Sequence, residues 1–308
     1  SRYERDFAEY ERIGKGGYGE VFRVENRLDG IQYAVKKIAL DALLNELRTL
    51  ARLDHPNIVR YFGGWLDMFP SDTTGLTSHA TTVPVLTLHV QMSLYPLTLT
   101  DFLSYNSQFP DSRHVSMPSL SRQYQGLRHC FHTLMSLLVF LALLDGVEYL
   151  HSQGLVHRDL KPANIFVSLS DRLSSSPSSI DRSRCRGCLS SDDFDKTPIY
   201  MNFRIGDFGL VAALASEGSL PESAQQTPRA VGTEHYRPRS ATVGVADEKL
   251  DIFALGVILF ELLWPFGTRM ERHETLSRLK GGELPERFVE TIGSGGGDIG
   301  KAIVEMVS

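Results

Sequence analysis

One segment decides the fold of this chain: His157-Arg158-Asp159-Leu160-Lys161-Pro162-Ala163-Asn164. It places a carboxylate at Asp159, an ammonium group at Lys161 and an amide at Asn164 within one short stretch. A carboxylate can accept a proton from a hydroxyl group, a lysine can neutralise a negatively charged group, and an amide oxygen can ligate a metal ion. This combination predicts a catalytic loop.

A second acidic motif, Asp207-Phe208-Gly209, follows further along the chain. Asp207 can supply a carboxylate to the same metal ion as Asn164, and Gly209 gives the backbone a flexible joint beside it. A triplet this short occurs by chance when it stands alone. Taken together with the segment 157–164, it makes Asp207 a candidate second ligand for a metal ion at Asn164.

A glycine cluster lies near the N-terminus, Gly14-Lys15-Gly16-Gly17-Tyr18-Gly19. Dinucleotide-binding folds use the same G-x-G-x-x-G spacing, but there the glycines open a helix. Here the next residues, Glu20-Val21-Phe22-Arg23-Val24, alternate in polarity and are rich in β-branched side chains, as in a strand. The context favours a strand-loop-strand flap whose backbone N–H groups cover phosphates, and it argues against a dehydrogenase. Without the other motifs, a plain glycine-rich hairpin would be the preferred interpretation.

A lysine and a glutamate follow the glycine cluster. Ala34-Val35-Lys36 ends an apolar strand, and Glu46 shares one side of a predicted helix with Leu43 and Leu50. An unpaired carboxylate on that inward side would be costly, and Lys36 is a partner that removes the cost. Glu46 as a boundary residue of an amphipathic helix stays open, because the helix after Lys36 is expected to be short.

Length and composition limit the class of protein. The chain has 308 residues, of which 42% are hydrophobic and 22% charged, as in ordinary globular proteins. A formal net charge of −5 gives no basic footprint for nucleic acid. The apolar run 134–144 is too short to span a membrane and predicts a buried helix. Apolar periodicity predicts strands at 10–13, 21–24, 33–38, 58–62 and 85–92, and helices at 134–149 and 250–263.

Residues 168–200 are rich in Ser and Arg. Such a composition buries too little apolar surface to offset the entropy of ordering, so we expect a flexible insertion with few contacts to the rest of the protein. The insertion holds Cys185 and Cys188, a C-x-x-C pair without a second pair at zinc spacing. We interpret both as solvated thiols. With only Cys130 besides, the cysteine content favours a reducing compartment.

Together these motifs, in this order, resemble the eukaryotic protein kinases. The glycine flap, Lys36, Glu46, the segment 157–164 and the triplet 207–209 fill the positions of the kinase pattern. Lys161 followed by proline resembles the serine/threonine branch. Finer stretches resemble the kinases of the alpha subunit of translation initiation factor 2, of the heme-regulated inhibitor and endoplasmic-reticulum types. These stretches are residues 2–7, 26–38, 53–59, 90–92 and 265–272.

The resemblance implies an α+β fold of two lobes, with one protein kinase domain over residues 1–308. Residues 1–94 would form a β-rich N-lobe, and residues 95–308 a mainly helical C-lobe that is truncated at its C-terminal end. ATP and Mg²⁺ are the implied cofactors. The implied nucleotide-binding residues are Ile13, Gly14, Lys15, Gly16, Gly17, Tyr18, Gly19, Val21, Ala34, Lys36, Met92, Leu94, Phe166 and Asp207.

The resemblance also implies an activity. The expected reaction transfers the γ-phosphoryl group of ATP to a serine of the initiation factor 2 alpha subunit, which down-regulates translation under stress. Asp159 would act as the base, while Asn164 and Asp207 would hold Mg²⁺. The alternative is a nucleotide-binding pseudokinase that acts as an allosteric or scaffolding partner. The implied catalytic residues are Asp159, Lys161, Asn164, Lys36 and Glu46.

Partners and location are further expectations from the resemblance. Arg2 and Asp6 would contribute to a homodimer through the N-lobe, or form a solvated i, i+4 pair. Residues 268–280 align with the helix that docks the protein substrate, and Thr227 and Thr233 lie in the activation segment. No direct binding of nucleic acid and no membrane segment are expected in this chain. Its location would be cytoplasmic.

One part of the kinase pattern is missing. Where kinases carry the motif APE, this chain has Tyr236-Arg237-Pro238-Arg239-Ser240, without the glutamate. The chain also ends at Ser308, before the arginine that pairs with that glutamate. We therefore expect a weakly anchored activation segment.

Overall fold

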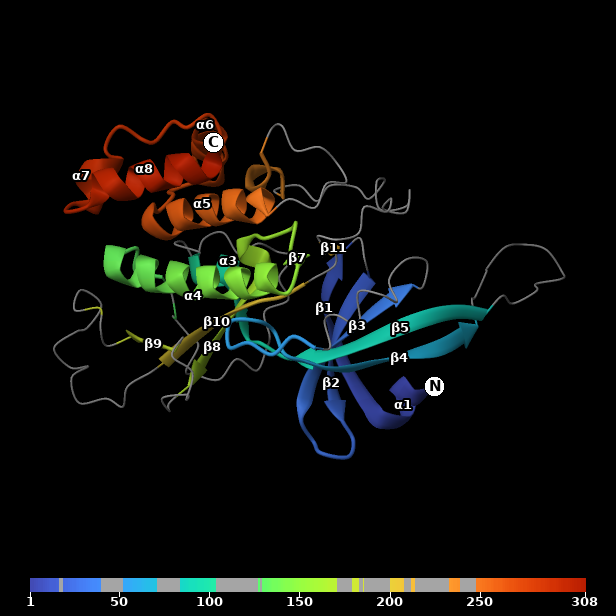
Figure 1. The fold of residues 1–308 in the computed structure, drawn as a ribbon. Helices are drawn as coiled ribbons and strands as arrows, with labels where there is room; N and C mark the ends of the chain where they lie inside the picture. The colour runs from blue at the N-terminus through green and yellow to red at the C-terminus, as the bar shows by residue number, and fades with distance from the viewer. Residues whose placement is uncertain are drawn as a thin grey trace, which may run out of the picture.

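The computed structural model describes the parts of the chain that carry the fold. Figure 1 shows a β-sheet near the N-terminus and a helical part that carries the C-terminus, which confirms the expected α+β fold of two lobes. The described residues are 1–16, 19–39, 52–70, 84–103, 127, 129–170, 179–182, 185, 200–207, 212–213, 233–238 and 248–308. The residues singled out above that lie outside them are Gly17, Tyr18, Leu43, Glu46, Leu50, Cys188, Phe208, Gly209, Thr227, Arg239 and Ser240.

The N-terminal part is a five-stranded antiparallel sheet in the order β1-β2-β3-β5-β4. Its strands are β1 (Phe7–Gly16), β2 (Gly19–Asn26), β3 (Gln32–Ala39), β4 (Tyr61–Pro70) and β5 (Pro84–Ser93). The strand predicted at 58–62 was placed too early. Ile58 forms a parallel bridge with Ile205 of the C-terminal part instead, and β4 begins at Tyr61.

A short helix, α1 (Arg2–Asp6), packs on this sheet. The carboxylate of Asp67 on β4 accepts the backbone N–H groups of Arg2 and Tyr3, each at 3.0 Å, and Tyr3 is buried. Within the helix, Arg2 Nε donates to Asp6 Oδ2 at 3.2 Å, and both side chains stay partly exposed. The i, i+4 pair of Arg2 and Asp6 is therefore present within a single chain.

The C-terminal part is built around two apolar helices. α4 (Thr133–Ser152) packs against α5 (Lys249–Leu263), and α8 (Gly296–Val307) packs on α5, as Figure 1 shows. Both predicted helices are thus confirmed. α5 is buried on nearly all sides, as expected for a helix without a polar face. The shorter helices are α3 (Leu99–Leu103), α6 (Arg269–Leu279) and α7 (Phe288–Ile292).

By length and composition alone, α4 could cross a membrane. In the structure it contributes Met135, Val139 and Leu143 to the buried core of the C-terminal part. A buried core helix passes the same test of length and composition. The helix predicted over 134–144 is confirmed, but it is buried on one side only, because Leu134 and Leu141 are exposed.

Small sheets in the C-terminal part bring catalytic segments together. β6 (Leu97–Thr98), β8 (Ile165–Ser170), β10 (Tyr200–Ile205) and β9 (Ile180–Asp181) form a four-stranded sheet in the order β6-β8-β10-β9, and β7 (Leu155–Val156) pairs with β11 (Ala212–Ala213). In the antiparallel pair of β8 and β10, Ile165 lies opposite Ile205. Because Asn164 precedes β8 and Asp207 follows β10, this register brings the two predicted metal ligands to the same edge.

The insertion predicted at 168–200 differs from its expectation where the structure describes it. Its first and last residues belong to β8 and β10, so the segment between the strands is shorter than predicted. Within it, β9 pairs with β10, and Ile180 and Cys185 are both buried in the core. The expectation of few contacts is therefore wrong for residues 179–182 and 185. A few apolar side chains anchor a stretch whose average composition is polar.

A buried asparagine joins the two parts of the molecule. Asn57 is 1% exposed, and its Nδ2 donates to the carbonyl oxygen of Phe203 at 3.0 Å. The backbone adds two bonds, from Ile205 N to Asn57 O at 2.7 Å and from Val59 N to Ile205 O at 2.8 Å. These bonds fix β10, and with it the segment that leads to Asp207, against the residues before β4.

Candidate active site

The predicted catalytic loop forms a compact polar group. Lys161 Nζ lies 2.7 Å from Asp159 Oδ2, and Asn164 Nδ2 donates to the same Oδ2 at 3.1 Å. Asn164 Nδ2 also donates to the backbone carbonyl of Asp159 at 2.8 Å. The structure thus brings together the three residues that the sequence predicts to do the chemistry, and two donors orient the carboxylate of Asp159.

A buried carboxylate anchors this loop from below. Asp251, in the first turn of α5, is fully buried and accepts the backbone N–H groups of His157 at 2.8 Å and Arg158 at 2.9 Å. His151 Nε2 lies 3.0 Å from the same carboxylate. Arg158 has a φ of +66°, a conformation that non-glycine residues seldom adopt, and the bond to Asp251 helps to hold it. Sequence analysis missed Asp251. The available signal was an acidic residue in the first turn of a helix whose following residues, up to Glu261, are apolar.

The loop is also joined to the residue before Asp207. The carbonyl oxygen of Gly206 lies 3.0 Å from His157 Nε2, and the Gly206 N–H donates to Asn164 O at 2.9 Å. A Cβ atom at Gly206 would lie 2.5 Å from Val59 Cγ2 and 2.9 Å from Phe166 Cε2. Glycine is the residue that fits between Val59 and Phe166 without displacing them. The two contacts of the Gly206 backbone hold the catalytic loop next to Asp207.

Lys36 and Asp207 meet across the two parts of the molecule. Lys36 Nζ lies 2.5 Å from Asp207 Oδ1, and Asp207 has a φ of +58°. Burial opposes ionisation of Asp207, but the Lys36 ammonium group outweighs this effect, with help from His157 and Lys161, and lowers the pKa of Asp207. Asp207 is therefore a carboxylate at neutral pH. The predicted partner of Lys36, Glu46, lies outside the described residues.

The apolar residues predicted around the nucleotide form one cluster. At its centre Ala34, Val59 and Met92 are buried. The side chains packed on this centre are Ile13, Val21, Tyr61, Leu94, Tyr95 and Phe166. Every apolar residue of the predicted nucleotide site that the structure describes belongs to this cluster, and sequence analysis missed Val59 and Tyr61. Such a cluster beside a lysine and a carboxylate has the composition of a nucleotide site, with an apolar surface for a base and polar groups for phosphates.

The glycine cluster lies in a hairpin rather than at the start of a helix. β1 ends at Gly16, β2 begins at Gly19, and these two residues are paired in the antiparallel register. Gly19 has a φ of +132°, and a Cβ atom there would lie 2.0 Å from the carbonyl oxygen of Lys37, so the position requires glycine. Lys15 Nζ lies 3.4 Å from Glu20 Oε1 across the hairpin. The strand-loop-strand arrangement of Gly14 and its neighbours is confirmed, and the dehydrogenase alternative is wrong.

A buried triad holds the residues that follow Thr233. In the short 3-10 helix Thr233–Tyr236, the Tyr236 hydroxyl donates to Glu261 of α5 and accepts from Arg272 Nη2 at 2.7 Å. Arg272 Nε in turn donates to Glu261 Oε1 at 2.6 Å. Burial raises the pKa of Tyr236, so its hydroxyl keeps the proton that it donates. The expectation of a weak anchor is therefore wrong at Tyr236, because α5 and α6 supply an ion pair that short motifs do not reveal.

The predicted metal ligands fit a hard divalent cation. Asn164 Nδ2 is engaged with Asp159, so the amide Oδ1 is the atom that can ligate. Asp207 adds an ionised carboxylate at the same edge of the β8–β10 pair. Mg²⁺ prefers a few oxygen ligands of this kind and keeps other positions for water and phosphate oxygens.

Comparisons with known proteins point in the same direction. A model of the protein kinase domain matches residues 7–281. The Schizosaccharomyces pombe protein "Eukaryotic translation initiation factor 2-alpha kinase 1" is 28% identical, over 95% of this chain and 59% of that protein. The "eIF-2-alpha kinase GCN2" of Arabidopsis thaliana is 30% identical, over 94% of this chain and 23% of that protein. The rat "Interferon-induced, double-stranded RNA-activated protein kinase" is 32% identical, over 91% of this chain and 45% of that protein.

These matches cover nearly the whole chain, while the chain spans between 23% and 59% of the length of the three relatives. The matched region holds the glycine hairpin, Lys36, the catalytic loop and Asp207, all in the geometry described above. Lys161 followed by Pro162 is the serine/threonine form of the catalytic loop. The chain therefore belongs to the protein kinase domain family, as a kinase of the serine/threonine type.

Proposed function

We propose that this chain transfers the γ-phosphoryl group of ATP to a serine of the alpha subunit of translation initiation factor 2. The observation that carries the proposal is the polar group of Asp159, Lys161 and Asn164, held on Asp251. The contact of Lys36 with Asp207 adds a cation for the phosphate oxygens and a carboxylate for the metal ion. Phosphoryl transfer of this kind depends on positioning and charge more than on covalent chemistry by the enzyme.

Each described residue has a role in this reaction. ATP supplies the transferred group, and Mg²⁺ neutralises the charge on its phosphate oxygens. Asp159 accepts the proton of the serine hydroxyl, and Lys161, 2.7 Å from that carboxylate, places a positive charge where the phosphoryl group passes. Lys36 binds phosphate oxygens, while Asn164 and Asp207 hold the cation. The apolar cluster around Ala34 and Met92 binds the adenine ring of ATP.

The choice of protein substrate rests on the similar proteins and on one helix. Two of the three relatives named above carry the initiation factor 2 alpha subunit in their names. The predicted docking stretch, residues 268–280, contains α6, which Thr268 caps by accepting the N–H of Glu271 at 3.0 Å. Met270 on this helix is 75% exposed, and an apolar side chain so exposed suits a protein contact. The biological result would be reduced translation under stress, in the cytoplasm.

Dimerisation through the N-lobe is part of the proposal. Arg2 and Asp6 pair within α1 but keep exposed surface, so exchange of partners between two chains needs no unfolding of the helix. A charge reversal at Arg2 alone, Arg2→Asp, should lower the dimer fraction in sedimentation, and adding Asp6→Arg should restore it. A dimer fraction that is the same in all three proteins would exclude this interface.

One assay tests the proposed reaction. Purified chain is given radiolabelled ATP and Mg²⁺ with either the initiation factor 2 alpha subunit or a generic basic protein, and the Asp159→Asn variant runs in parallel. We expect label on the alpha subunit, little on the basic protein and none with the variant. Label on both proteins would support a kinase with another substrate. Binding of nucleotide without any transfer would favour the pseudokinase alternative.

A further inference from the structure

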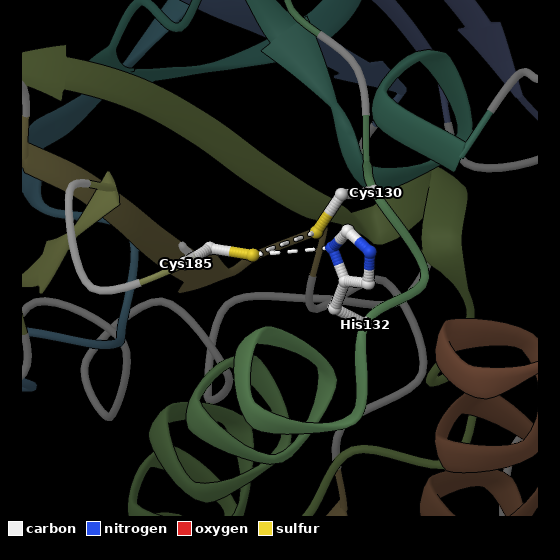
Figure 2. A group of neighbouring side chains, drawn as sticks. All are labelled: Cys130, His132 and Cys185. Carbon is white, nitrogen blue, oxygen red and sulfur yellow. Dashed lines mark hydrogen bonds between the residues drawn. The ribbon is translucent and has the colours of Figure 1, made fainter. Parts of the chain in front are cut away.

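Cys130 and His132, two residues apart before α4, converge with Cys185, which lies 53 positions after His132 in sequence (Figure 2). Cys130 Sγ lies 3.8 Å from Cys185 Sγ, and His132 Nδ1 lies 3.1 Å from the same sulfur. All three ligand atoms lie within 4.8 Å of one another. Cys185 is 4% exposed, so its interpretation as a solvated thiol is wrong. Sequence spacing showed no second pair of zinc ligands beside the C-x-x-C motif. In the fold, Cys130 and His132 form such a pair next to Cys185.

We propose that these three side chains bind a zinc ion that stabilises the fold, with a water molecule as the fourth ligand of the tetrahedron. Two thiolates on tetrahedral zinc, each about 2.3 Å from the metal, lie about 3.8 Å apart. The sulfur atoms of Cys130 and Cys185 have this separation, 3.8 Å, whereas a disulfide would bring them to about 2.05 Å. A thiolate and an imidazole nitrogen on the same ion lie about 3.6 Å apart. His132 is exposed, so a small rotation of its ring can supply the difference from the observed 3.1 Å.

The donor set selects the metal. Two thiolates and one imidazole are ligands that zinc prefers, while Mg²⁺ and Ca²⁺ prefer oxygen. Iron–sulfur clusters take four protein ligands, more than the three side chains of this group supply. On binding, each thiol releases its proton to solvent, and the sum of one Zn²⁺, two thiolates and a neutral imidazole is zero charge. A neutral assembly suits a place where one ligand is almost fully buried.

The surroundings give the ion space and a structural task. Both thiols line a small cavity with Met135, Arg182 and Met201. As Figure 2 shows, Cys130 and His132 come from the segment that leads into α4, while Cys185 comes from the loop after β9. The ion would therefore tie the insertion to the main core helix. The catalytic loop contacts the other end of α4 through His151 and Asp251, so this site is separate from the active site.

Metal analysis of the full 308-residue chain tests the proposal. The protein is purified in reducing buffer, supplied with zinc chloride and desalted, and its metal content is measured by plasma mass spectrometry. We expect about one zinc per chain, with the content falling by most of that amount in Cys130→Ser and in His132→Ala. His132 is exposed, so its variant should fold even if replacement of the buried Cys185 does not. His132→Cys keeps a ligand and should keep the metal.

A matched control separates loss of a ligand from disturbance of the segment. Leu134→Ala changes an exposed residue in the first turn of α4 and should keep the zinc. Substitution with Co²⁺ should give a thiolate-to-metal charge-transfer band that disappears in Cys130→Ser. Either of two outcomes overturns the proposal: parent protein without stoichiometric zinc, or an unchanged zinc content in both His132→Ala and Cys130→Ser.

A second measurement tests the proposed task. Removal of zinc by a chelator should increase cleavage of the parent chain by a protease between β8 and β10. The His132→Ala variant should already be cleaved at the higher rate, and the chelator should not change it further. If the chelator strips zinc from the parent without any effect on cleavage there, the ion does not tie the insertion to α4.

Discussion

Lys36 Nζ on β3 and Asp207 Oδ1 after β10 lie 2.5 Å apart, although 171 positions separate them in sequence. Lys36 is 9% exposed, whereas the side chain of Asp207 is 46% exposed, so the contact lies at the edge of the interior and water screens part of the attraction. One residue is assigned to the phosphates and the other to the metal ion. Their contact therefore joins the N-terminal sheet to the proposed metal ligand Asp207, and it favours the ionised form of that carboxylate.

Lys36→Met should weaken nucleotide binding and raise the pKa of Asp207. Without the ammonium group, the effect of burial on the carboxylate is less opposed. Loss of one charge-assisted contact, worth about 1.5–3 kcal/mol, predicts an affinity for ATP that is about 10 to 100 times lower. Calorimetry gives the affinity, and NMR titration of the aspartate carboxyl carbons gives the pKa.

The same substitution should move acid unfolding. A lowered pKa in the folded protein contributes stability above the unfolded pKa, and this contribution disappears as the pH falls through the lowered value. In Lys36→Met the folded-state pKa of Asp207 rises towards its unfolded value, so this contribution shrinks and stability should fall less steeply as the pH drops from neutral into the acid range. Lys37→Met is the matched control, because Lys37 contacts Glu9 on the other face of the sheet. Lys37 helps to lower the pKa of Glu9 against the effect of burial, so this control also changes the pH dependence of stability, but it should leave the pKa of Asp207 at the parental value. An equal rise of the Asp207 pKa in both variants would contradict the specific role of Lys36.

Asp159→Asn should abolish phosphoryl transfer and leave ATP affinity within a few-fold of the parent. The amide cannot accept the proton of the serine hydroxyl, and a general base contributes about 10²- to 10⁴-fold to the rate. Asp159 contacts Lys161 and Asn164, and it is not part of the apolar cluster that is assigned to the adenine ring of ATP. Single-turnover transfer and calorimetric binding of ATP separate the two effects. Transfer at the parental rate would remove Asp159 from the mechanism.

Sequence was sufficient where the chemistry is local or follows a strand. Asp159, Lys161 and Asn164 lie within one loop, so their spacing alone brings them together. Ala34 and Met92 are direct partners across β3 and β5, and alternation along strands places such pairs on one face. The apolar residues that the resemblance implies around the nucleotide therefore lie in one cluster.

Sequence was insufficient where distant segments supply the partner. Asp251 is 94 positions from His157, and no short motif links the two. The prediction that Cys185 is solvated was wrong because its neighbours, Cys130 and His132, come from another part of the chain. In each case the tertiary fold creates the environment, whereas composition and spacing describe only the neighbours along the chain.

Asp251→Asn should destabilise the protein and slow catalysis. An amide can accept only one of the two backbone N–H groups that the carboxylate now accepts, and its own NH₂ group faces the other donor. Leaving a buried donor unsatisfied costs about 1–3 kcal/mol, so we expect a loss of this size in denaturant unfolding. The rate should fall with ATP affinity nearly unchanged, because Asp251 holds the loop and touches none of the apolar cluster.

The control is Asp145→Asn on α4, whose carboxylate is 53% exposed and lies near His55. An exposed pair of this kind contributes about 0–1 kcal/mol, so this variant should resemble the parent in stability and in rate. If the Asp251 variant were as stable and as active as this control, the anchoring role of Asp251 would be wrong.

Arg272→Met should destabilise the C-terminal part. It leaves Glu261, which is 3% exposed, without its cation, and breaking a buried ion pair costs about 3–5 kcal/mol. Adding Glu261→Gln should recover part of that loss, because the remaining buried group is then neutral. Thermal unfolding of the single and double variants measures this coupling. Arg278→Met, which disrupts the exposed pair with Glu283, serves as control, and an equal loss there would contradict the argument.

Met270→Glu should impair phosphorylation of the initiation factor 2 alpha subunit without changing autophosphorylation. Met270 is 75% exposed on α6, so the substitution does not disturb the core, but it places a charge in the proposed protein contact. Glu271 is a poorer test position, because its carboxylate accepts the N–H of Gly267 at 2.8 Å and shapes the turn before the helix. We expect a higher KM for the alpha subunit, by about tenfold for a loss of about 1.4 kcal/mol, and an unchanged KM for ATP.

Val289→Glu, at a half-exposed position on α7, should leave all of these values at the parental level. A loss of autophosphorylation in the Met270 variant, or an equal rise of KM in the Val289 variant, would exclude α6 as the specific docking helix.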